Sequence, residues 1–161
     1  MKKIIYSLLC FVLVSGMLIT DLDAQTAEEP AILVSCGQSP GPVKLKIFMT
    51  RLGIDYDYKL MATAADLLAK KESGTPYKTL IIVTGASLKG MGAAGVSVDD
   101  ELNRSKALIA EAKKQDITIV GAHIEGMARR SAGADPGDNS DEQSIDAVCP
   151  NANFMLIMKE G

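Results

Sequence analysis

The sequence predicts a doubly wound α/β domain with a mainly parallel, five-stranded sheet. Short apolar runs alternate with segments of helical periodicity, in the order β-α-β-α-β-α-β-α-β. Glycine-rich polar loops follow three of these runs, at 35–41, 84–92 and 121–126. Because right-handed crossovers join parallel strands, we expect the flavodoxin-like, Rossmann-like strand order 2-1-3-4-5. Its switch point then lies between the first and third strands.

The strands are predicted from the apolar runs. The run 79–83 is β-branched and apolar throughout, which is typical of a strand buried on both faces. The other runs have ordinary strand lengths and are bounded by turn residues. We therefore predict strands at 31–36, 56–61, 79–83, 117–120 and 153–158.

The helices are predicted from capping residues and periodicity. Pro42 suits the first helical position and Gly53 the C-terminal stop of a helix after the first strand. Val43, Ile47 and Phe48 form its predicted apolar stripe. Capping patterns at Thr63, Ser97 and Ser140 open further helices over 64–71, 98–114 and 140–148.

The first 24 residues have the layout of a secretory signal peptide. Lys2 and Lys3 precede an apolar run over 4–20, and Leu22-Asp23-Ala24 suits cleavage. An uncleaved membrane anchor is the alternative, but the run is shorter than the roughly 20 residues that a spanning helix needs. We therefore expect a periplasmic or secreted protein. Its single mature domain covers 25–161 and keeps no stable membrane anchor.

Composition excludes several classes of partner. Cleavage would remove two lysines and two aspartates, so the mature chain keeps the net charge of −3 and has no electrostatic reason to bind nucleic acid. The full sequence has four Tyr, three Phe and no Trp, so the protein offers little stacking surface for a flavin, and we expect no cofactor. Cys36 and Cys149 belong to opposite edges of the predicted sheet, so we expect two free thiols.

Polar residues follow the strands at the edge of the sheet where open α/β folds bind ligands. The first loop resembles a phosphate cradle before a helix N-terminus, although a tight turn that only caps the helix is the alternative. Arg129 and Arg130 suit carboxylate or phosphate, or they pair with Asp135, Asp138 or Asp141 instead. We predict a small polar or anionic ligand, bound by Gly37, Gln38, Ser39, Thr84, Gly85, Ser87, His123, Glu125, Arg129 and Arg130.

A hydrolase or transferase that uses His123 or Cys36 is the alternative function. His123 is the only histidine and suits a general base, a metal ligand or a hydrogen-bonding orienter, or a purely structural role. Cys36 is near a predicted helix N-terminus, which lowers a thiol pKa, but small buried cysteines are common. One histidine and one carboxylate do not make a metal site. A protein-interaction module is the third hypothesis.

The segment 90–95 matches the residues of the dinucleotide-binding pattern G-x-G-x-x-G, but its position relative to the neighbouring strand and helix does not fit that motif. Five residues separate Gly90 from Thr84, whereas the first glycine should follow the strand directly. The next helix opens with Asp99, Asp100 and Glu101, which would repel a pyrophosphate. We therefore expect no dinucleotide site and interpret this stretch as a mobile glycine-rich flap.

Four segments taken together resemble an uncharacterised family of exported bacterial proteins, known only as domain of unknown function number 6305. They are 37–41, 84–95, 125–130 and 141–150, and the resemblance covers about 31–161. It implies export and an α/β fold, and it brings no activity, substrate or catalytic residue. Members of that family run on through a Gly/Asn-containing loop and a last helix. We therefore expect this sequence to be truncated before its last helix.

Overall fold

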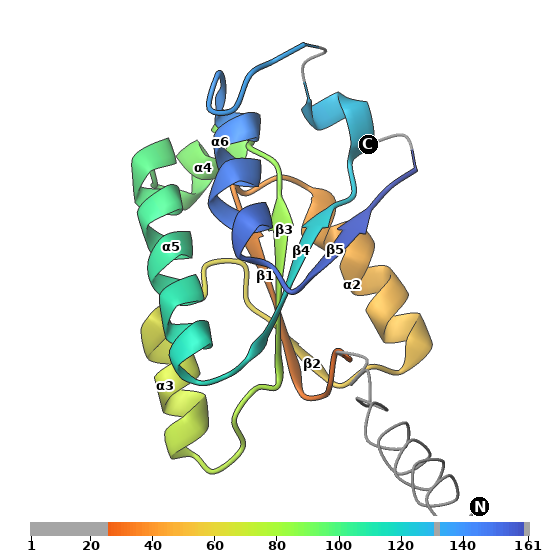
Figure 1. The fold of residues 1–161 in the computed structure, drawn as a ribbon, viewed down its shortest axis with the longest axis vertical. Coiled ribbons are helices and arrows are strands. Elements are labelled where there is room, and N and C mark those ends of the chain that lie inside the picture. Colours follow the sequence, from red (N-terminus) through yellow and green to blue (C-terminus); the bar gives the residue numbers. More distant parts are fainter. Residues whose placement is uncertain (1–25, 131–132, 160–161) are drawn as a thin grey trace, which may run out of the picture.

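Five parallel strands form one sheet in the order β2-β1-β3-β4-β5 (Figure 1). The computed structural model describes residues 26–130 and 133–159, so the predicted signal peptide lies outside the described residues. The strand order is the predicted flavodoxin-like one, with the switch point between β1 and β3. The strands are β1 Ala31–Cys36, β2 Tyr56–Tyr58, β3 Thr79–Thr84, β4 Thr118–His123 and β5 Phe154–Ile157.

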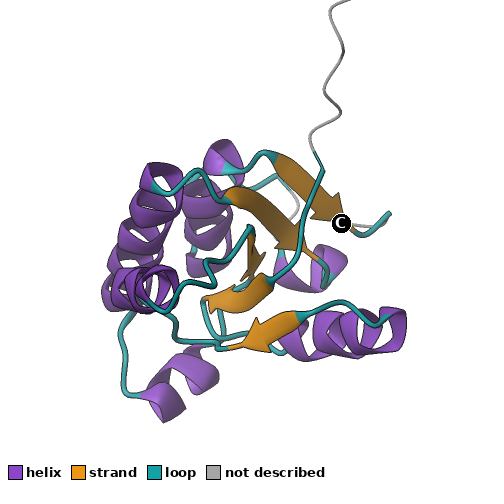
Figure 2. Cartoon of the chain, turned by 90° about the horizontal axis from the view of Figure 1, so that it is seen from below, coloured by secondary structure: helices purple, strands orange, loops and turns teal. Residues whose placement is uncertain are grey.

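Helices cover the two faces of the sheet unequally (Figures 1 and 2). On one face α3, α5 and α6 pack side by side over a core that includes Ile32, Leu80 and Leu108. On the other face α2 packs over Leu33 and Val83. The helices are α2 Gly41–Leu52, α3 Ala64–Glu72, α4 Leu88–Ala94, α5 Val98–Lys114 and α6 Ser140–Val148, with short 3-10 helices η1 Gly126–Arg129 and η2 Cys149–Asn151.

Two strands, β2 and β4, end three residues away from their predicted ends, whereas the ends of the other three strands agree within one residue. β4 runs on through Gly121 to His123 because this stretch pairs with β5, and Ala122 is opposite Leu156. His123 is therefore the last residue of a strand and not the start of a loop. β2 ends at Tyr58, three residues early, because it pairs only with β1 and only over three residues.

The apolar stripe predicted for α2 is wrong. Leu45 and Met49 face the sheet, while Ile47 and Phe48 are half exposed. Gly41 determines which side of α2 faces the sheet. A Cβ at this position would lie 2.8 Å from Val83 Cγ1, so the first turn of α2 packs directly against β3. Positions four and eight residues later share the face of Gly41, which turns the predicted stripe outward.

The predicted glycine-rich flap is a short helix, α4, with an N-cap at Ser87 and a left-handed end at Gly95. A Cβ at Gly90 would lie 2.3 Å from the Gln38 carbonyl oxygen. This glycine therefore allows a close approach between α4 and the first loop. Mobility is not its role.

The second face of the sheet is bare beside α2. Leu156 and Met158 at the end of the chain are 44% and 46% exposed. Over the ranges 26–130 and 133–159, no helix has the length and apolar character to cross a membrane.

Candidate functional site

The loops that follow β1 and β3 are joined to each other at the carboxyl edge of the sheet. Gln38 and Ala86 form an isolated antiparallel bridge, and the Ser87 N–H donates to the Gly37 carbonyl at 2.7 Å. The two loops therefore behave as one unit across the switch point. All ten residues predicted for the ligand site lie on or beside this edge.

The first loop is fixed by a buried ion pair from α5. Glu101 Oε1 accepts hydrogen bonds from the Gly37 N–H at 3.0 Å and from the Gln38 side-chain amide at 2.6 Å. The Glu101 side chain is 1% exposed and pairs with Arg104 at 2.9 Å. The loop also places Gln38 in the left-handed region, with φ of 55°. The Gln38 side chain is thus engaged within the protein.

Sequence reasoning missed Glu101 and Arg104. The signal was available, because Glu101 and Leu108 are seven residues apart on α5 and therefore share its inner face. A carboxylate on an inward face needs a buried partner, and Arg104 lies one turn further on. Glu101 was instead counted among the acids at the helix start that would repel a pyrophosphate.

The N-terminus of α2 offers few free amides to an anion. The Gly41 N–H donates to Ser39 Oγ at 3.2 Å, and the Val43 N–H donates to the Pro40 carbonyl at 3.1 Å. Pro42 has no N–H, and the Gln38 N–H donates to Ser35 Oγ at 2.9 Å. The loop therefore has the geometry of the capping turn that was the alternative to a phosphate cradle.

His123 is buried in a short hydrogen-bonded chain. Its Nε2 lies 3.1 Å from the Gly126 carbonyl, which only accepts, so Nε2 carries a proton. Its Nδ1 lies 3.2 Å from Thr84 Oγ1. With both ring nitrogens engaged and 4% of the residue exposed, His123 orients the chain between β4 and η1. This is the purely structural role that the sequence analysis gave as one alternative for His123.

The environment of Cys36 disfavours the reactive thiolate form of its side chain. Burial raises the pKa of the Cys36 thiol to about 11, despite a hydrogen bond from Ser105 that opposes the shift. Burial also raises the pKa of Cys149. Both are free thiols, as predicted. Neither Cys36 nor His123 therefore has the geometry that the enzyme alternative requires of it.

The two arginines are paired with glutamates and not with the aspartates considered as their alternative partners. Arg130 binds Glu142 through two nitrogens at 3.1 and 3.2 Å, and Glu142 is 2% exposed. Arg129 donates to the Ala86 carbonyl, and its Nε lies 3.7 Å from Glu125 Oε2. Little positive charge remains for an anion at this edge.

The β3 loop is held from α6 by groups that the sequence did not indicate. The Gly85 N–H donates to Ser144 Oγ at 3.0 Å, and the Ala86 N–H donates to Asp141 at 2.6 Å. Ser87 accepts from the Gly90 N–H and so caps α4. The predicted loop residues are thus mostly engaged within the protein.

Glu125 is the exception. Its side chain is 6% exposed, and Oε2 accepts no hydrogen bond from any residue the structure describes. A Cβ built on Gly41 or on Gly85 would lie 3.2 Å from this oxygen and 3.1–3.2 Å from Ser39 Oγ. The Ser39 hydroxyl and this carboxylate oxygen therefore lie against both glycines, where an added Cβ would be closer than ordinary van der Waals contact.

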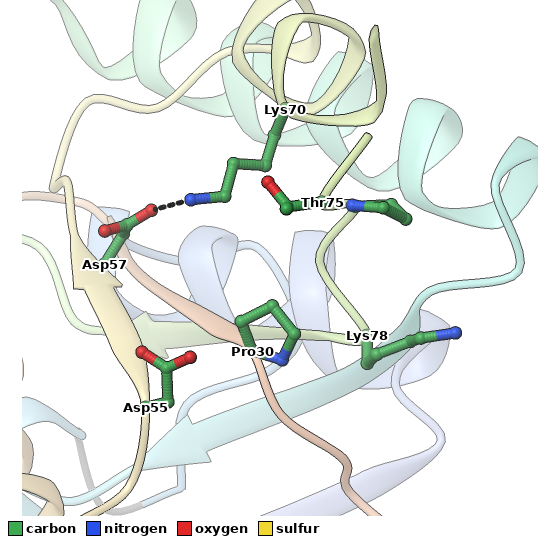
Figure 3. A pocket seen from close by; sticks show the side chains of 7 residues that line it. Pro30, Asp55, Asp57, Lys70, Thr75 and Lys78 are labelled. Carbon is green, nitrogen blue, oxygen red and sulfur yellow. Dashed lines mark hydrogen bonds and ion pairs between the residues drawn. The ribbon is translucent and has the colours of Figure 1, made fainter. Parts of the chain in front are cut away.

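The opposite edge of the sheet carries a polar pocket of about 490 Å³ (Figure 3). Lys70 reaches across it to Asp57 at 2.9 Å. Hydrogen bonds from Tyr77 and Lys70 lower the pKa of Asp57. This pocket is open, and of its four charged residues Asp57 and Lys70 are paired, whereas Asp55 and Lys78 make no ion pair with a described residue. Within 26–130 and 133–159, no cluster of three or more His, Cys, Asp or Glu suits a metal ion.

Comparison with known proteins identifies the family. The model of the family described as "Domain of unknown function (DUF6305)" matches residues 28–161. The chain belongs to this family. No protein with a curated function matches it. The family carries no assigned activity, so DUF6305 membership confirms the resemblance seen in the four sequence segments and adds no chemistry to it.

Solved structures similar to this DUF6305 chain share its fold class only. A CheY-like protein (TadZ) from Pseudomonas aeruginosa PAO1 is 15% identical, with a TM-score of 0.41 over 82% of this chain and 84% of that one. A psychrotrophic esterase, EstA, from Pseudoalteromonas sp. is 13% identical, with a TM-score of 0.39 over 81% and 78%. A GDP-L-fucose synthetase from Naegleria fowleri is 10% identical, with a TM-score of 0.42 over 83% and 49%.

Proposed function

We propose that this DUF6305 domain binds a small polar ligand at the switch point, and that the ligand donates a hydrogen bond to Glu125. The observation that carries the proposal is that Glu125 Oε2 is buried and accepts no hydrogen bond from a described residue, although Arg129 Nε lies 3.7 Å away. A buried oxygen without a hydrogen bond is costly, and such groups are rare in native proteins. A donor supplied by a ligand removes that cost.

The surroundings of Glu125 favour an amine or a hydroxyl over an anion. Arg129 at 3.7 Å balances the charge of Glu125 rather than exceeding it, and Arg130 is paired with Glu142. Ser39 Oγ lies against the same two glycines and adds a second polar atom near Glu125 Oε2. The sequence prediction was a small polar or anionic ligand, and of these two we now propose the polar one, a hydrogen-bond donor that is neutral or cationic.

We also propose that the protein is exported from the cytoplasm. The basic start, apolar run and small-residue cleavage site at 1–24 support a periplasmic or secreted location. Under that proposal the ligand is a small molecule of the extracytoplasmic space. Cell fractionation with an antibody to the domain tests it, and recovery with the cytosolic fraction would contradict it.

The ligand proposal is tested by calorimetry with ethanolamine and glycerol as donor probes and inorganic phosphate as the anionic probe. We expect a donor probe to bind and Glu125→Gln to weaken its binding by about ten-fold or more, because a hydrogen bond to a charged group contributes roughly 1.5–3 kcal/mol. Glu72→Gln is the matched control, since Glu72 is exposed at the end of α3. Preferential binding of phosphate, or an equal loss in both variants, would contradict the proposal.

A further inference from the structure

The charged side chains that hold the carboxyl edge of the sheet together do not balance. Asp141 accepts the Ala86 N–H and makes no ion pair with a described residue. The other charged groups of this network form pairs, so the network carries one negative charge in excess. Its guanidinium groups belong to Arg104, Arg129 and Arg130, and its carboxylates belong to Glu101, Glu125, Asp141 and Glu142.

Glu125 has a cation nearby but receives no hydrogen bond from it. Arg129 Nε lies 3.7 Å from Glu125 Oε2, whereas Arg129 Nη1 donates to the Ala86 carbonyl. In an N–H···O hydrogen bond the two heavy atoms lie within about 3.2 Å of each other. Arg129 therefore offsets the charge of Glu125 and leaves Oε2 without a donor.

Two acceptor atoms lie against the same glycine. Glu125 Oε2 and Ser39 Oγ would each be 3.2 Å from a Cβ added at Gly41. Ser39 Oγ accepts one hydrogen bond, from the Gly41 N–H, and a hydroxyl oxygen has a second lone pair to offer. A ligand hydroxyl brings one donor, whereas a primary ammonium group brings three donors and a positive charge. The ammonium group therefore matches both the acceptors and the excess negative charge.

We infer that the ligand of the Glu125 site is a small primary ammonium compound that competes with Arg129 for Glu125; this rests on the proposed function, whose ligand it narrows to one chemical class. Because Oε2 is covered, the ligand reaches it by displacing a neighbour. Gly41 and Gly85 contribute backbone, whereas Arg129 contributes a long side chain without a hydrogen bond to Oε2. The bond from Arg129 to Ala86 is separate, so the guanidinium can withdraw from Glu125 while the loop stays closed.

The inference requires a charge and an N–H donor in the same group. A trimethylammonium group has the charge but no N–H, so it offsets the excess negative charge and leaves Glu125 Oε2 without a hydrogen bond. A neutral hydroxyl donates a hydrogen bond but brings no charge. Only a group with both properties satisfies the oxygen and neutralises the edge.

Calorimetry on the wild-type protein tests the ligand class with three related probes. Ethanolamine carries a primary ammonium group, ethylene glycol has a hydroxyl in its place, and choline has a trimethylammonium group there. We expect ethanolamine to bind about ten-fold more tightly than either of the others, because hydrogen bonds between ionised groups are roughly twice as strong as neutral ones. Equal binding of ethylene glycol or of choline would overturn the inference and leave the proposed function standing. Absence of binding by every donor probe would contradict the proposed function itself.

Variants of Arg129 test the competition. Arg129→Gln removes the competing charge and keeps an N–H donor for the Ala86 carbonyl, so ethanolamine should bind about five-fold more tightly or better, whereas ethylene glycol should change less. Lys89→Met is the matched control, because Lys89 is exposed on α4 and makes no ion pair with a described residue. Arg129→Met serves as a second variant, and circular dichroism verifies that each variant is folded. Unchanged or weaker binding of ethanolamine in the folded Arg129 variants, or an equal gain in Lys89→Met, would overturn the competition.

Discussion

The carboxyl edge of the sheet and the outer side of α2 and β5 are opposites in how their side chains are used. At the edge, loops rich in glycine and polar residues are held by buried side chains such as Glu101 and Ser144. On α2 and β5, helix and strand residues such as Phe48 and Ile157 are half exposed. The loops at the edge are therefore closed, whereas these helix and strand residues are exposed. Loop composition therefore does not by itself locate the available surface.

Removal of Glu101 should have the largest effect on the closed edge. Glu101→Ala leaves Arg104 nearly buried without its partner and removes the acceptor of Gly37 and Gln38. We expect a loss of about 3–5 kcal/mol in the free energy of unfolding, measured by urea denaturation.

The control for this variant removes both charges. Replacement of Glu101 and Arg104 together by methionine leaves no unpaired charge, so it should cost less than Glu101→Ala alone. A loss below about 1 kcal/mol in Glu101→Ala would show that the loop does not depend on the ion pair.

Alanine substitutions at two glycines of α4 form a matched pair, and their expected effects on stability are smaller. Gly90→Ala places a Cβ 2.3 Å from the Gln38 carbonyl oxygen, whereas Gly92→Ala adds a methyl group to open space. We expect the first to cost about 1–3 kcal/mol of stability and the second to gain up to about 1 kcal/mol. Thermal unfolding compares the two. Equal stabilities would mean that α4 does not press on the first loop.

The smallest stability effect is expected at Leu52, at the C-terminal end of α2. Leu52→Ser changes a side chain that is 75% exposed, so the free energy of unfolding should change by less than about 0.5 kcal/mol. Urea denaturation beside wild type measures it. A loss above 1.5 kcal/mol would show that Leu52 supports the fold and is not a free part of the open surface.

The sheet and its order were predictable from the sequence, but the orientation of α2 was not. The runs at 31–36 and 79–83 are long enough and apolar enough to identify β1 and β3, and handedness rules then restrict the topology. The helix α2 is apolar on two sides, so periodicity alone does not choose its inner face. The contact of Gly41 with Val83, which decides it, is a tertiary one.

The location of the candidate site was predictable, whereas the use of its side chains was not. Strand ends indicate which loops meet at one edge, and the ten predicted residues do lie there. Whether Gln38 or Arg129 is free depends on partners far along the chain, Glu101 for the first and Ala86 for the second. Residue types do not carry that information. They also gave Glu125 no special place among the ten.

Ala86 has a consequence for the dynamics of the edge. Its N–H is bound by Asp141, its carbonyl by Arg129, and its backbone bridges Gln38, so one loop residue joins α6, η1 and the β1 loop. Local opening of this loop must break all of these bonds together. The free energy of that opening should therefore approach that of global unfolding, as it does for core strands. The glycine-rich edge should therefore open locally about as rarely as the central strands of the sheet.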